Sequence, residues 1–409
     1  MPQIQLVADL PGHSAAAWCV AFNPSRPLLA SCSTDKTVRL FSYTLPSDST
    51  LSDPFPAADA ATPKLQLVQS IPTEHKRTVR SVAWAPGGRT LATASFDSTV
   101  GVWEEVEAGE MGDEGVSGAA GGEMEWECVT TLEGHENECK SVGFSADGGL
   151  LASCSRDRSV WVWEVQPDAD FECIAVMMDH GADVKNIAWH PKEEILASAS
   201  YDAHINVMFD DPDGDWGLFQ RLTPTLPAAD LHIPHSSVAL VAAMGDSPAE
   251  AAANAIDVPP LVEAETVWSL AWSPCGRFLA SGGDRGGIRL WVRMGSNPDS
   301  ELHEVIHTSA HRGACYALSW GPGGAADGAG LLASAGADGR VIVWQVKALT
   351  GDGDVPGATI EPVAAMRDAH GVADVNSIAW NVREDGKGAG LLSSAGDDGS
   401  VKVWRVVKD

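Results

Sequence analysis

The sequence has no long hydrophobic run. No stretch of about 18 consecutive apolar residues occurs in the chain, so a membrane-spanning helix is not expected. The first residues, MPQIQLVADLPGH, also lack the positively charged region followed by an apolar core that marks a secretory leader. We therefore expect a soluble, unprocessed protein.

Basic residues are scarce. The chain has 27 Lys and Arg against 56 Asp and Glu, which gives a formal net charge of -29. Nucleic-acid phosphates and acidic lipids attract Lys and Arg. The composition therefore argues against nucleic acid and against an anionic membrane as binding partners.

Cysteine motifs are missing as well. The eight cysteines are scattered, with no CxxC pair and no Cys/His cluster at zinc spacing. We interpret them as small buried residues in a reducing, cytoplasmic compartment, and we expect neither a metal nor another cofactor. The cysteines are Cys19, Cys32, Cys128, Cys139, Cys154, Cys173, Cys275 and Cys315.

What the chain does contain is one frame repeated seven times. Each copy has a His, an apolar-rich run ending in an aromatic residue, then L-A-S or a close variant, an Asp, and an aromatic or apolar residue six positions later. The best copies run from His75 to Trp103 and from His135 to Trp163. The spacing from His to Asp is 22 residues in four copies and 27 or 28 in the last two. Constant spacing indicates constant geometry, and the added residues indicate a longer surface loop.

Within each copy the apolar residues alternate, as in SVAWAPGGRTLATASFDSTVGVW, which predicts short antiparallel strands. Period, alternation and the final Trp or Phe are typical of WD40 repeats, whose sheets must stack around an axis to bury both faces. We expect an all-β fold, a seven-bladed WD40 β-propeller forming a single domain over 1–409. The expected blade cores are 13–43, 75–103, 135–165, 180–209, 264–293, 311–346 and 370–409.

The last copy stops at VKVWRVVKD, after its third strand. Ile4 to Leu10 precede the first His and are apolar at alternating positions. We infer that this N-terminal strand completes the last blade, which removes an open sheet edge.

The repeated His and Asp could suggest a metal or a catalytic site, but a structural role explains them better. In WD40 blades such a His and Asp form hydrogen bonds with a strand Ser or Thr and with the Trp, because buried polar groups need partners. The expected residues of this structural lock are His75, Asp97, Trp103, His135, Asp157, Trp163, His180, Asp202, His311, Asp338, Trp344, Asp398 and Trp404.

The fifth copy departs from the frame, since Glu263 stands at the His position and Arg285 at the Asp position. Two alternatives follow: blade five is locally less rigid, or Glu263 and Arg285 form a substitute pair.

Four inserts interrupt the repeats. They are poor in aromatic residues and rich in Ala, Gly, Pro and acidic residues, so we expect flexible excursions that add little core. The stretch SPAEAAANAI could instead form a short helix that contacts a partner. The inserts are 44–63, 105–123, 223–262 and 347–359.

Two positions in each blade are expected to face one mouth of the central channel: the residue five or six places after the His, and the residue just before the Asp. Five of these 14 positions are aromatic, whereas the chain average of 7% predicts one. Aromatic residues and Arg are typical of interface hot spots, although these rings could also pack merely between loops. The candidate partner-binding residues are Arg156, Trp18, Arg80, Phe96, Lys140, Lys185, Tyr201, Trp268 and Tyr316.

No catalytic constellation is found. There is no G-x-S-x-G motif and no Gly-rich phosphate loop between a strand and a helix. We therefore expect a non-catalytic scaffold rather than an enzyme.

The third and fourth copies carry a more specific likeness. LEGHENECKSVGFSADGGLLASCSRDRSVWVWEV and HGADVKNIAWHPKEEILASASYDAHINV resemble the WD40 subunit of the cytosolic iron-sulfur protein assembly (CIA) targeting complex, and the likeness extends through all seven blades. The resemblance implies delivery of iron-sulfur clusters to cytosolic and nuclear apoproteins, with Arg156 in a partner-binding role. It implies as partners a MIP18-family protein, a HEAT-repeat adaptor, an iron-only-hydrogenase-like cluster carrier and iron-sulfur apoprotein clients.

Two other hypotheses remain open. A generic WD40 adaptor, such as a ubiquitin-ligase substrate receptor, would want a W-D-x-R blade ending, whereas the endings here are WEE, WEV, WVR, WQV and WRV. An enzyme or a direct cluster binder would show turnover or colour when purified.

Overall fold

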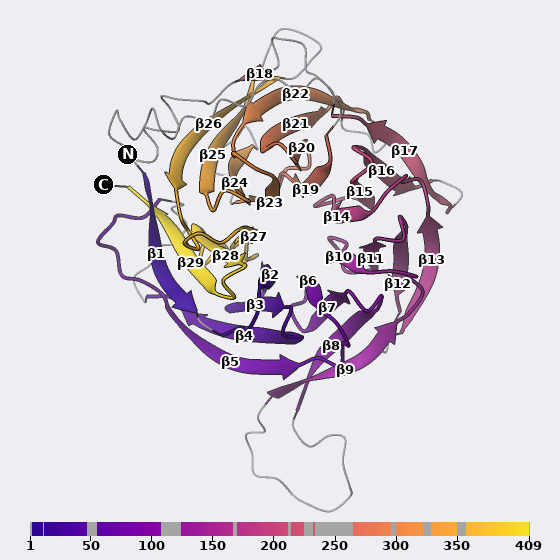
Figure 1. The fold of residues 1–409 in the computed structure, drawn as a ribbon, viewed down its shortest axis with the longest axis horizontal. Helices are drawn as coiled ribbons and strands as arrows, with labels where there is room; N and C mark the ends of the chain where they lie inside the picture. Colours follow the sequence, from indigo (N-terminus) through magenta and orange to yellow (C-terminus); the bar gives the residue numbers. More distant parts are fainter. Residues whose placement is uncertain are drawn as a thin grey trace, which may run out of the picture.

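The protein forms a ring of seven antiparallel sheets around a central axis, seen end-on in Figure 1. The described residues contain 29 strands, and no helix there is long and apolar enough to cross a membrane. The computed structural model describes residues 2–10, 12–46, 55–107, 124–166, 170–211, 214–224, 232–233, 265–295, 300–321, 329–349 and 357–408.

Blades one to four each contain four consecutive strands, ordered from the channel outward. Blade one has β2 (Ala17–Phe22), β3 (Leu28–Ser33), β4 (Thr37–Thr44) and β5 (Lys64–Pro72). Blade two has β6 (Val79–Trp84), β7 (Thr90–Ser95), β8 (Val100–Glu107) and β9 (Met124–Leu132). Blade three has β10 (Cys139–Phe144), β11 (Leu150–Ser155), β12 (Val160–Val165) and β13 (Phe171–Met177). Blade four has β14 (Val184–Trp189), β15 (Ile195–Ser200), β16 (Ile205–Asp210) and β17 (Trp216–Leu222).

The remaining blades follow the same order, with an added strand in blade five and a borrowed one in blade seven. Blade five has β19 (Val267–Trp272), β20 (Phe278–Gly283), β21 (Gly287–Arg293), β22 (Leu302–Ser309) and the added β18 (His232–Ile233). Blade six has β23 (Cys315–Trp320), β24 (Gly330–Gly336), β25 (Val341–Leu349) and β26 (Gly357–Met366). Blade seven has β27 (Val375–Trp380), β28 (Leu391–Gly396), β29 (Val401–Val407) and β1 (Gln3–Leu10).

The ring closes through the two ends of the chain. Strand β1 pairs antiparallel with β29, with Gln3 opposite Val407 and Leu10 opposite Val401. The termini therefore lie side by side, as Figure 1 shows. Because β1 covers the outer edge of the third strand, blade seven has the same four strands as its neighbours.

The core lies between blades. Each hydrophobic cluster joins the strands of two neighbouring blades; Leu40 of blade one, for example, lies in one cluster with Trp84 and Leu91 of blade two. In blades two, four, five and six, the Trp that ends the inner strand also donates its indole N–H to the previous blade, as from Trp84 to the carbonyl of Ala21 at 3.0 Å. The recurrent aromatic thus packs and hydrogen-bonds across the blade interface.

The described parts of the inserts include strand residues and hydrogen bonds to the ring. In the first insert, residues 55–63 are described, and Arg405 of β29 donates to the carbonyls of Ala58 and Ala60 at 2.9 and 2.7 Å. Hydrogen bonds therefore connect this part to the last blade, whereas its composition predicts a flexible excursion. Within 223–262, β18 pairs in parallel with β22. The stretch SPAEAAANAI lies outside the described residues.

The other two inserts are reduced by longer strands. Strand β8 continues to Glu107 and β9 starts at Met124, while β25 continues to Leu349 and β26 starts at Gly357. Only residues 108–123 and 350–356 of these two inserts lie outside the description.

Candidate functional site

The inner strands of all seven blades meet around one mouth of the central channel, where they line a cavity of about 100 Å³. Each strand contributes the residue that the repeat places five or six positions after its His. These residues are Trp18, Arg80, Lys140, Lys185, Trp268, Tyr316 and Asn376. Equivalent positions in successive blades therefore face a common opening, and we call the nine candidate partner-binding residues around it the channel-mouth surface.

Basic side chains of this surface lie on aromatic rings. The guanidinium carbon of Arg80 is 4.8 Å from the ring centroid of Trp18. The ammonium nitrogen of Lys140 is 4.1 Å from the ring centroid of Phe96. Each contact contributes about 0.5–1 kcal/mol at an exposed site and holds a flexible cation in one place.

Lys185 connects two more aromatic residues. Its nitrogen is 3.6 Å from the ring centroid of Tyr201 and 5.1 Å from that of Trp268. The Trp268 ring meets Tyr201 and Tyr316 edge-to-face, with centroids 5.2 and 5.0 Å apart. Edge-to-face packing fixes ring orientation, so blades four to six present a continuous, ordered aromatic surface.

Arg156 reaches the same end of the ring from the turn before Asp157. Its side chain is 54% exposed, and its nitrogens lie 3.8 Å from a Glu138 oxygen and 3.9 Å from an Asp183 oxygen. Glu138 in turn accepts a hydrogen bond from Lys140 at 2.7 Å, and Lys140 lines the channel mouth. Arg156 therefore lies at the same end of the ring as Trp18.

Sequence reasoning did not find two members of this network. Glu138 accepts from Arg77 as well as from Lys140, both at 2.7 Å, and Arg77 also donates to the carbonyl of Phe96. Burial raises the pKa of Glu138, but the hydrogen bonds from Lys140 and Arg77 outweigh it and hold the pKa below its usual value. The repeat pattern does not identify Arg77, because the pattern describes positions within one blade. The contact of Arg77 is with Glu138, which belongs to the next blade.

The surroundings of Lys185 change its pKa. Burial lowers its pKa, and the neighbouring positive charge of Lys140 lowers it further, to about 8. The amine is therefore mostly charged at pH 7 and loses its charge above pH 8.

Hydrogen bonds also connect the two channel-facing positions of a single blade, which are the residue five or six places after the His and the residue just before the Asp. The indole N–H of Trp18 donates to Thr34 at 2.7 Å, and that of Trp268 donates to Asp284 at 2.8 Å. These bonds fix the ring positions through the indole N–H groups, while Arg80 and Lys185 lie over the rings themselves.

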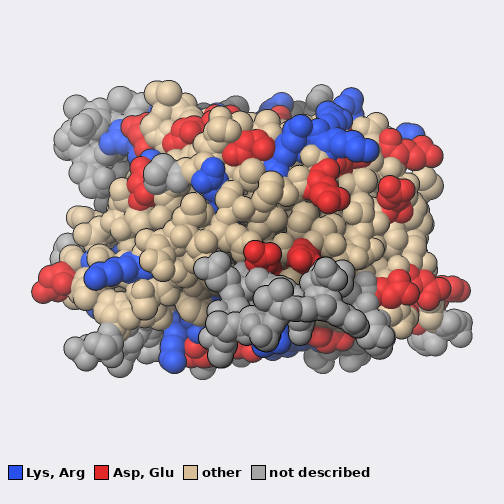
Figure 2. All heavy atoms as spheres, turned by 90° about the horizontal axis from the view of Figure 1, so that it is seen from below, with Lys and Arg blue, Asp and Glu red and all other residues tan. Residues whose placement is uncertain are grey.

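The charged side chains of the outer wall gather toward its two margins, whereas its middle is mainly uncharged in the side view of Figure 2. Exposed apolar side chains of the outer strands belong to this wall: Leu6, Leu67, Val68, Val129, Ile174, Val176 and Leu218.

Away from the mouth, the lock positions form a repeated hydrogen-bond network. In blade three, His135 Nδ1 lies 2.9 Å from Asp157, and its Nε2 lies 2.8 Å from Ser153. Trp163 donates to the same Ser153 oxygen at 3.3 Å, and Asp157 accepts the backbone N–H of Glu136. Every polar atom of the imidazole is thereby paired, which agrees with a structural role.

Three other blades have the full set of four residues. They are His75, Thr93, Asp97 and Trp103 in blade two, His311, Ser334, Asp338 and Trp344 in blade six, and His370, Ser394, Asp398 and Trp404 in blade seven.

Blades one and four keep the His, Asp and Ser but lack the Trp. In blade four, His180 Nδ1 lies 2.9 Å from Asp202 and its Nε2 lies 2.8 Å from Ser198. The position of the Trp is taken by Met208 in blade four and by Phe41 in blade one, and both side chains are buried.

The lock ionises its aspartates. Burial raises the pKa of Asp202, but hydrogen bonds from His180 and the Gly181 backbone outweigh it and lower the pKa to about 2. In blade six, burial is likewise outweighed by the charge and hydrogen bond of His311, and the pKa of Asp338 falls to about 2. Burial lowers the pKa of His311, but the charge and hydrogen bond of Asp338 outweigh it and raise the pKa. His311 and Asp338 thus form a buried pair in which each favours the charged form of the other.

Blade five replaces the lock by a different set of residues. Buried Glu265 accepts the backbone N–H of Arg285 at 3.1 Å. The fully buried guanidinium of Arg289 lies 3.6 Å from Glu265 and hydrogen-bonds Glu304. Glu263 lies outside the described residues. The repeat places Glu263 at the His position. The carboxylate that contacts the Arg285 backbone is that of Glu265, two residues later in the sequence.

Cysteines and acidic groups offer no centre for a metal in the described part of the chain, where no cluster of three or more His, Cys, Asp or Glu side chains could hold an ion. All eight cysteines are free. Four are buried, whereas Cys173 is exposed on β13, so the expectation of buried cysteines is wrong at that position.

Comparison with known proteins identifies the repeat. The family described as WD domain, G-beta repeat matches seven segments, which include the inner strands of every blade. The matched residues are 4–42, 66–104, 126–164, 171–207, 262–292, 303–345 and 361–405.

Full-length relatives narrow the family further. A protein of Cryptococcus neoformans var. neoformans serotype D, named probable cytosolic iron-sulfur protein assembly protein 1, is 60% identical over 100% of both chains. Proteins of the same name from Mycosarcoma maydis and Aspergillus terreus are 42% and 35% identical, each over 98% of this chain and over 92% and 98% of their own. The chain therefore belongs to the WD40 repeat family and, within it, to the family of the cytosolic iron-sulfur protein assembly protein 1.

Proposed function

We propose that this protein is a non-catalytic scaffold of cytosolic iron-sulfur protein assembly, and that it holds its partners on the channel-mouth surface. The relatives that match it over its full length are named for that process. The seven-bladed ring supplies a rigid frame, and the described residues contain no candidate metal cluster. The cluster is cargo carried by partners, and this chain brings donor and acceptor proteins together.

The single observation that carries the proposal is the convergence of ordered aromatic and basic side chains from blades one to six, together with Asn376 of blade seven, on one opening. Rings held edge-to-face and cations held on rings lose little conformational freedom on binding, so such a surface is preorganised for a partner. Aromatic residues and Arg contribute most to interface energies. Arg156, half exposed between two carboxylates, is the most accessible charge of the set.

The partners proposed for this surface are those implied by the sequence resemblance. They are a MIP18-family protein, a HEAT-repeat adaptor, an iron-only-hydrogenase-like cluster carrier and apoprotein clients. The site of action is the cytoplasm, with nuclear apoproteins among the clients. A generic WD40 adaptor function has no observation in its favour.

The test is capture of partners from cytosol by the tagged protein and by its Arg156→Glu variant. We expect the wild type to retain a MIP18-family or HEAT-repeat protein, identified by mass spectrometry. The variant should lose at least tenfold of that capture, because a carboxylate replaces the guanidinium next to Glu138 and Asp183.

Arg89→Glu is the matched control. It makes the same change of charge at an exposed position in the turn between β6 and β7, at the strand ends remote from the channel mouth. The control should capture partners as the wild type does, and all three proteins should melt at similar temperatures. Recovery of neither partner class by the wild type, or equal losses in both variants, would contradict the proposal.

A further inference from the structure

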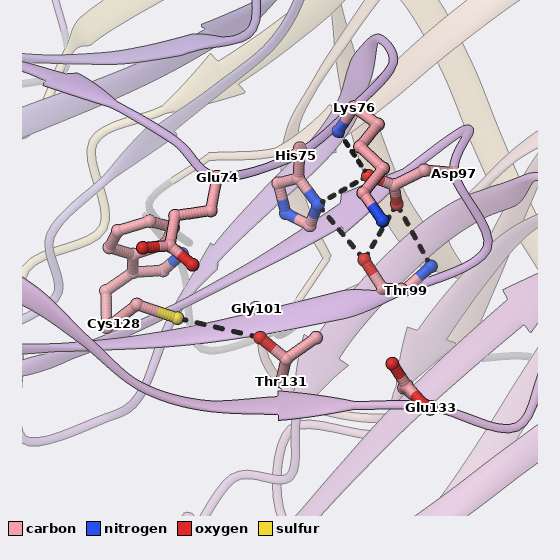
Figure 3. A pocket seen from close by; sticks show the side chains of 10 residues that line it. Glu74, His75, Lys76, Asp97, Thr99, Gly101, Cys128, Thr131 and Glu133 are labelled. Atoms are coloured by element: carbon pink, nitrogen blue, oxygen red, sulfur yellow. Dashed lines mark hydrogen bonds and ion pairs between the residues drawn. The ribbon is translucent and has the colours of Figure 1, made fainter.

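Blade two has a cavity that its neighbours fill. It measures about 230 Å³ and lies between the outer strands β8 and β9 and the loops that carry His75 and Asp97. Figure 3 shows Glu74, Cys128 and Glu133 around the open space beside Gly101. The cavity lies on the outer half of the blade, away from the channel-mouth surface.

The cavity exists because β8 has a glycine at one register position. Gly101 of β8 pairs with Thr93, the hydroxyl residue of the blade-two lock. In every other blade, the residue at the position of Gly101 pairs in the same way with the Ser at the position of Thr93. Those other six positions all have large or polar side chains. They are Arg39, Trp161, Asn206, Arg289, Ile342 and Lys402.

In four of these blades the chain places its own cation at the equivalent site. In blade seven, Lys402 donates to the carbonyl of Ala369 at 2.9 Å and lies 6.0 Å from the ring centroid of Trp404. In blade four, Arg221 of the outer strand donates to Asn206 and to the carbonyl of Asp179. Ala369 and Asp179 each directly precede the lock His, so the same backbone carbonyl is the acceptor in both blades.

Blades one and five follow the same pattern. The guanidinium of Arg39 lies against Gly12, the residue before His13. The contact is so close that a Cβ added to Gly12 would be 2.7 Å from the Arg39 guanidinium. In blade five, Arg289 lies between Glu265 and Glu304. The site is therefore repeatedly occupied by a positive charge near the lock.

Blade two keeps the acceptors for such a charge but has no cation at this register position. The carbonyl that precedes the lock His belongs to Glu74, and Trp103 lines the cavity as Trp404 does in blade seven. The exposed carboxylates of Glu74 and Glu133 add two negative charges, against the single positive charge of exposed Lys76.

We propose that this cavity binds the guanidinium of an arginine from a basic segment of a partner protein. Its volume is below the range of about 300–1,000 Å³ typical of small-molecule sites, which favours a single side chain as the occupant. The planar fork would donate to the Glu74 carbonyl and to the carboxylates of Glu74 and Glu133, in the bidentate manner that Arg prefers. The inference goes beyond the proposed docking at the channel mouth and does not depend on it.

The experiment titrates the full-length protein with acetyl-Gly-Arg-Gly-amide and observes the Trp103 indole N–H and the Gly101 amide by NMR. One side chain supports only millimolar affinity, so saturation is expected at millimolar peptide. The Lys peptide should bind more weakly because it lacks the fork. The Ala peptide should leave both signals unchanged.

Glu74→Gln/Glu133→Gln should weaken the Arg peptide about tenfold without change in melting, because both side chains are exposed. Gly101→Arg should abolish binding, since the chain then supplies its own cation; because its Cβ would lie 2.9 Å from Thr93 Oγ1, the result counts only if the variant melts as the wild type does. Glu136→Gln/Glu172→Gln is the matched control, with the same loss of two exposed charges in blade three, and should bind as wild type does. The proposal fails if acetyl-Gly-Trp-Gly-amide binds in preference, as Trp161 would suggest, if the Arg peptide does not bind, or if the control weakens equally.

Discussion

At the scale of single residues, Arg156 and Asp157 are adjacent in the sequence but differ in their expected contribution to stability. Arg156 is half exposed and has only long ion-pair contacts, whereas the adjacent Asp157 accepts hydrogen bonds from His135, the Glu136 backbone and Ser159. An exposed charge contributes little to folding, while an acceptor of several buried donors contributes much. Neighbours in sequence can therefore be separated by their effects on stability.

Asp157→Ala should lower the free energy of unfolding by about 1–3 kcal/mol, because it leaves the donors of His135 and Ser159 without their acceptor. The measurement is urea unfolding followed by tryptophan fluorescence. Arg156→Glu is the comparison, and its unfolding midpoint should stay within error of the wild type. Exchanged phenotypes, with the Arg156 variant unstable and the Asp157 variant stable, would show that the two roles are assigned the wrong way round.

At the scale of elements, the described part of the first insert is tied to the last strand rather than free. Arg405 of β29 is almost fully buried and donates to the carbonyls of Ala58 and Ala60 and to Gln5 of β1. One side chain thus holds the insert, the N-terminal strand and the C-terminal strand together. Composition predicts loose structure here because Ala and Pro bury little area, but the hydrogen bonds come from a residue about 345 positions away.

Arg405→Ala should release residues 55–63, because four hydrogen bonds to that segment and to β1 are lost. We expect amide exchange at Ala57, Ala60 and Lys408 to become at least tenfold faster, measured by hydrogen exchange with mass spectrometry. Lys347→Ala, which removes an exposed cation from β25, is the control. Unchanged protection in the Arg405 variant would mean that the strand pairing alone holds the insert.

At the scale of the whole molecule, the aspartates of the locks make the free energy of unfolding depend on pH in the acidic range. The folded aspartates have pKa values of about 2 in blades four and six and still lower in blades two and three. Unfolded Asp has a pKa near 3.9, so the unfolded chain binds more protons between these values. The contribution is complete above about pH 4 and is lost as the pH falls toward 2.

The urea midpoint should therefore be nearly constant from pH 7 to 5 and fall steeply between pH 4 and 2. Asp202→Asn should start from a lower midpoint and show a shallower fall, because one depressed carboxyl no longer titrates. Thr73→Ser, an uncharged change outside the locks, should keep the wild-type slope. Equal slopes in the wild type and the Asp202 variant would contradict the assignment of this pH dependence to the locks.

Much of the architecture is predictable from this sequence because its code is periodic. Alternation on a period of two and the regular spacing of His, Asp and Trp place strands, blades and channel-facing positions without knowledge of any contact. The exception in the fifth copy is also visible in the sequence, because Glu263 and Arg285 replace the usual His and Asp.

Contacts between distant residues were decided only in three dimensions. In blade five, Glu265 accepts the backbone N–H of Arg285 and lies 3.6 Å from the buried guanidinium of Arg289, which comes from another strand. Arg77 reaches Glu138 across a blade boundary, and the blade-two cavity depends on Gly101 together with loops about 26 residues before it and 32 after it. Local spacing in a repeat determines where a backbone goes, whereas the partner of each buried charge depends on which side chains the closed ring brings together.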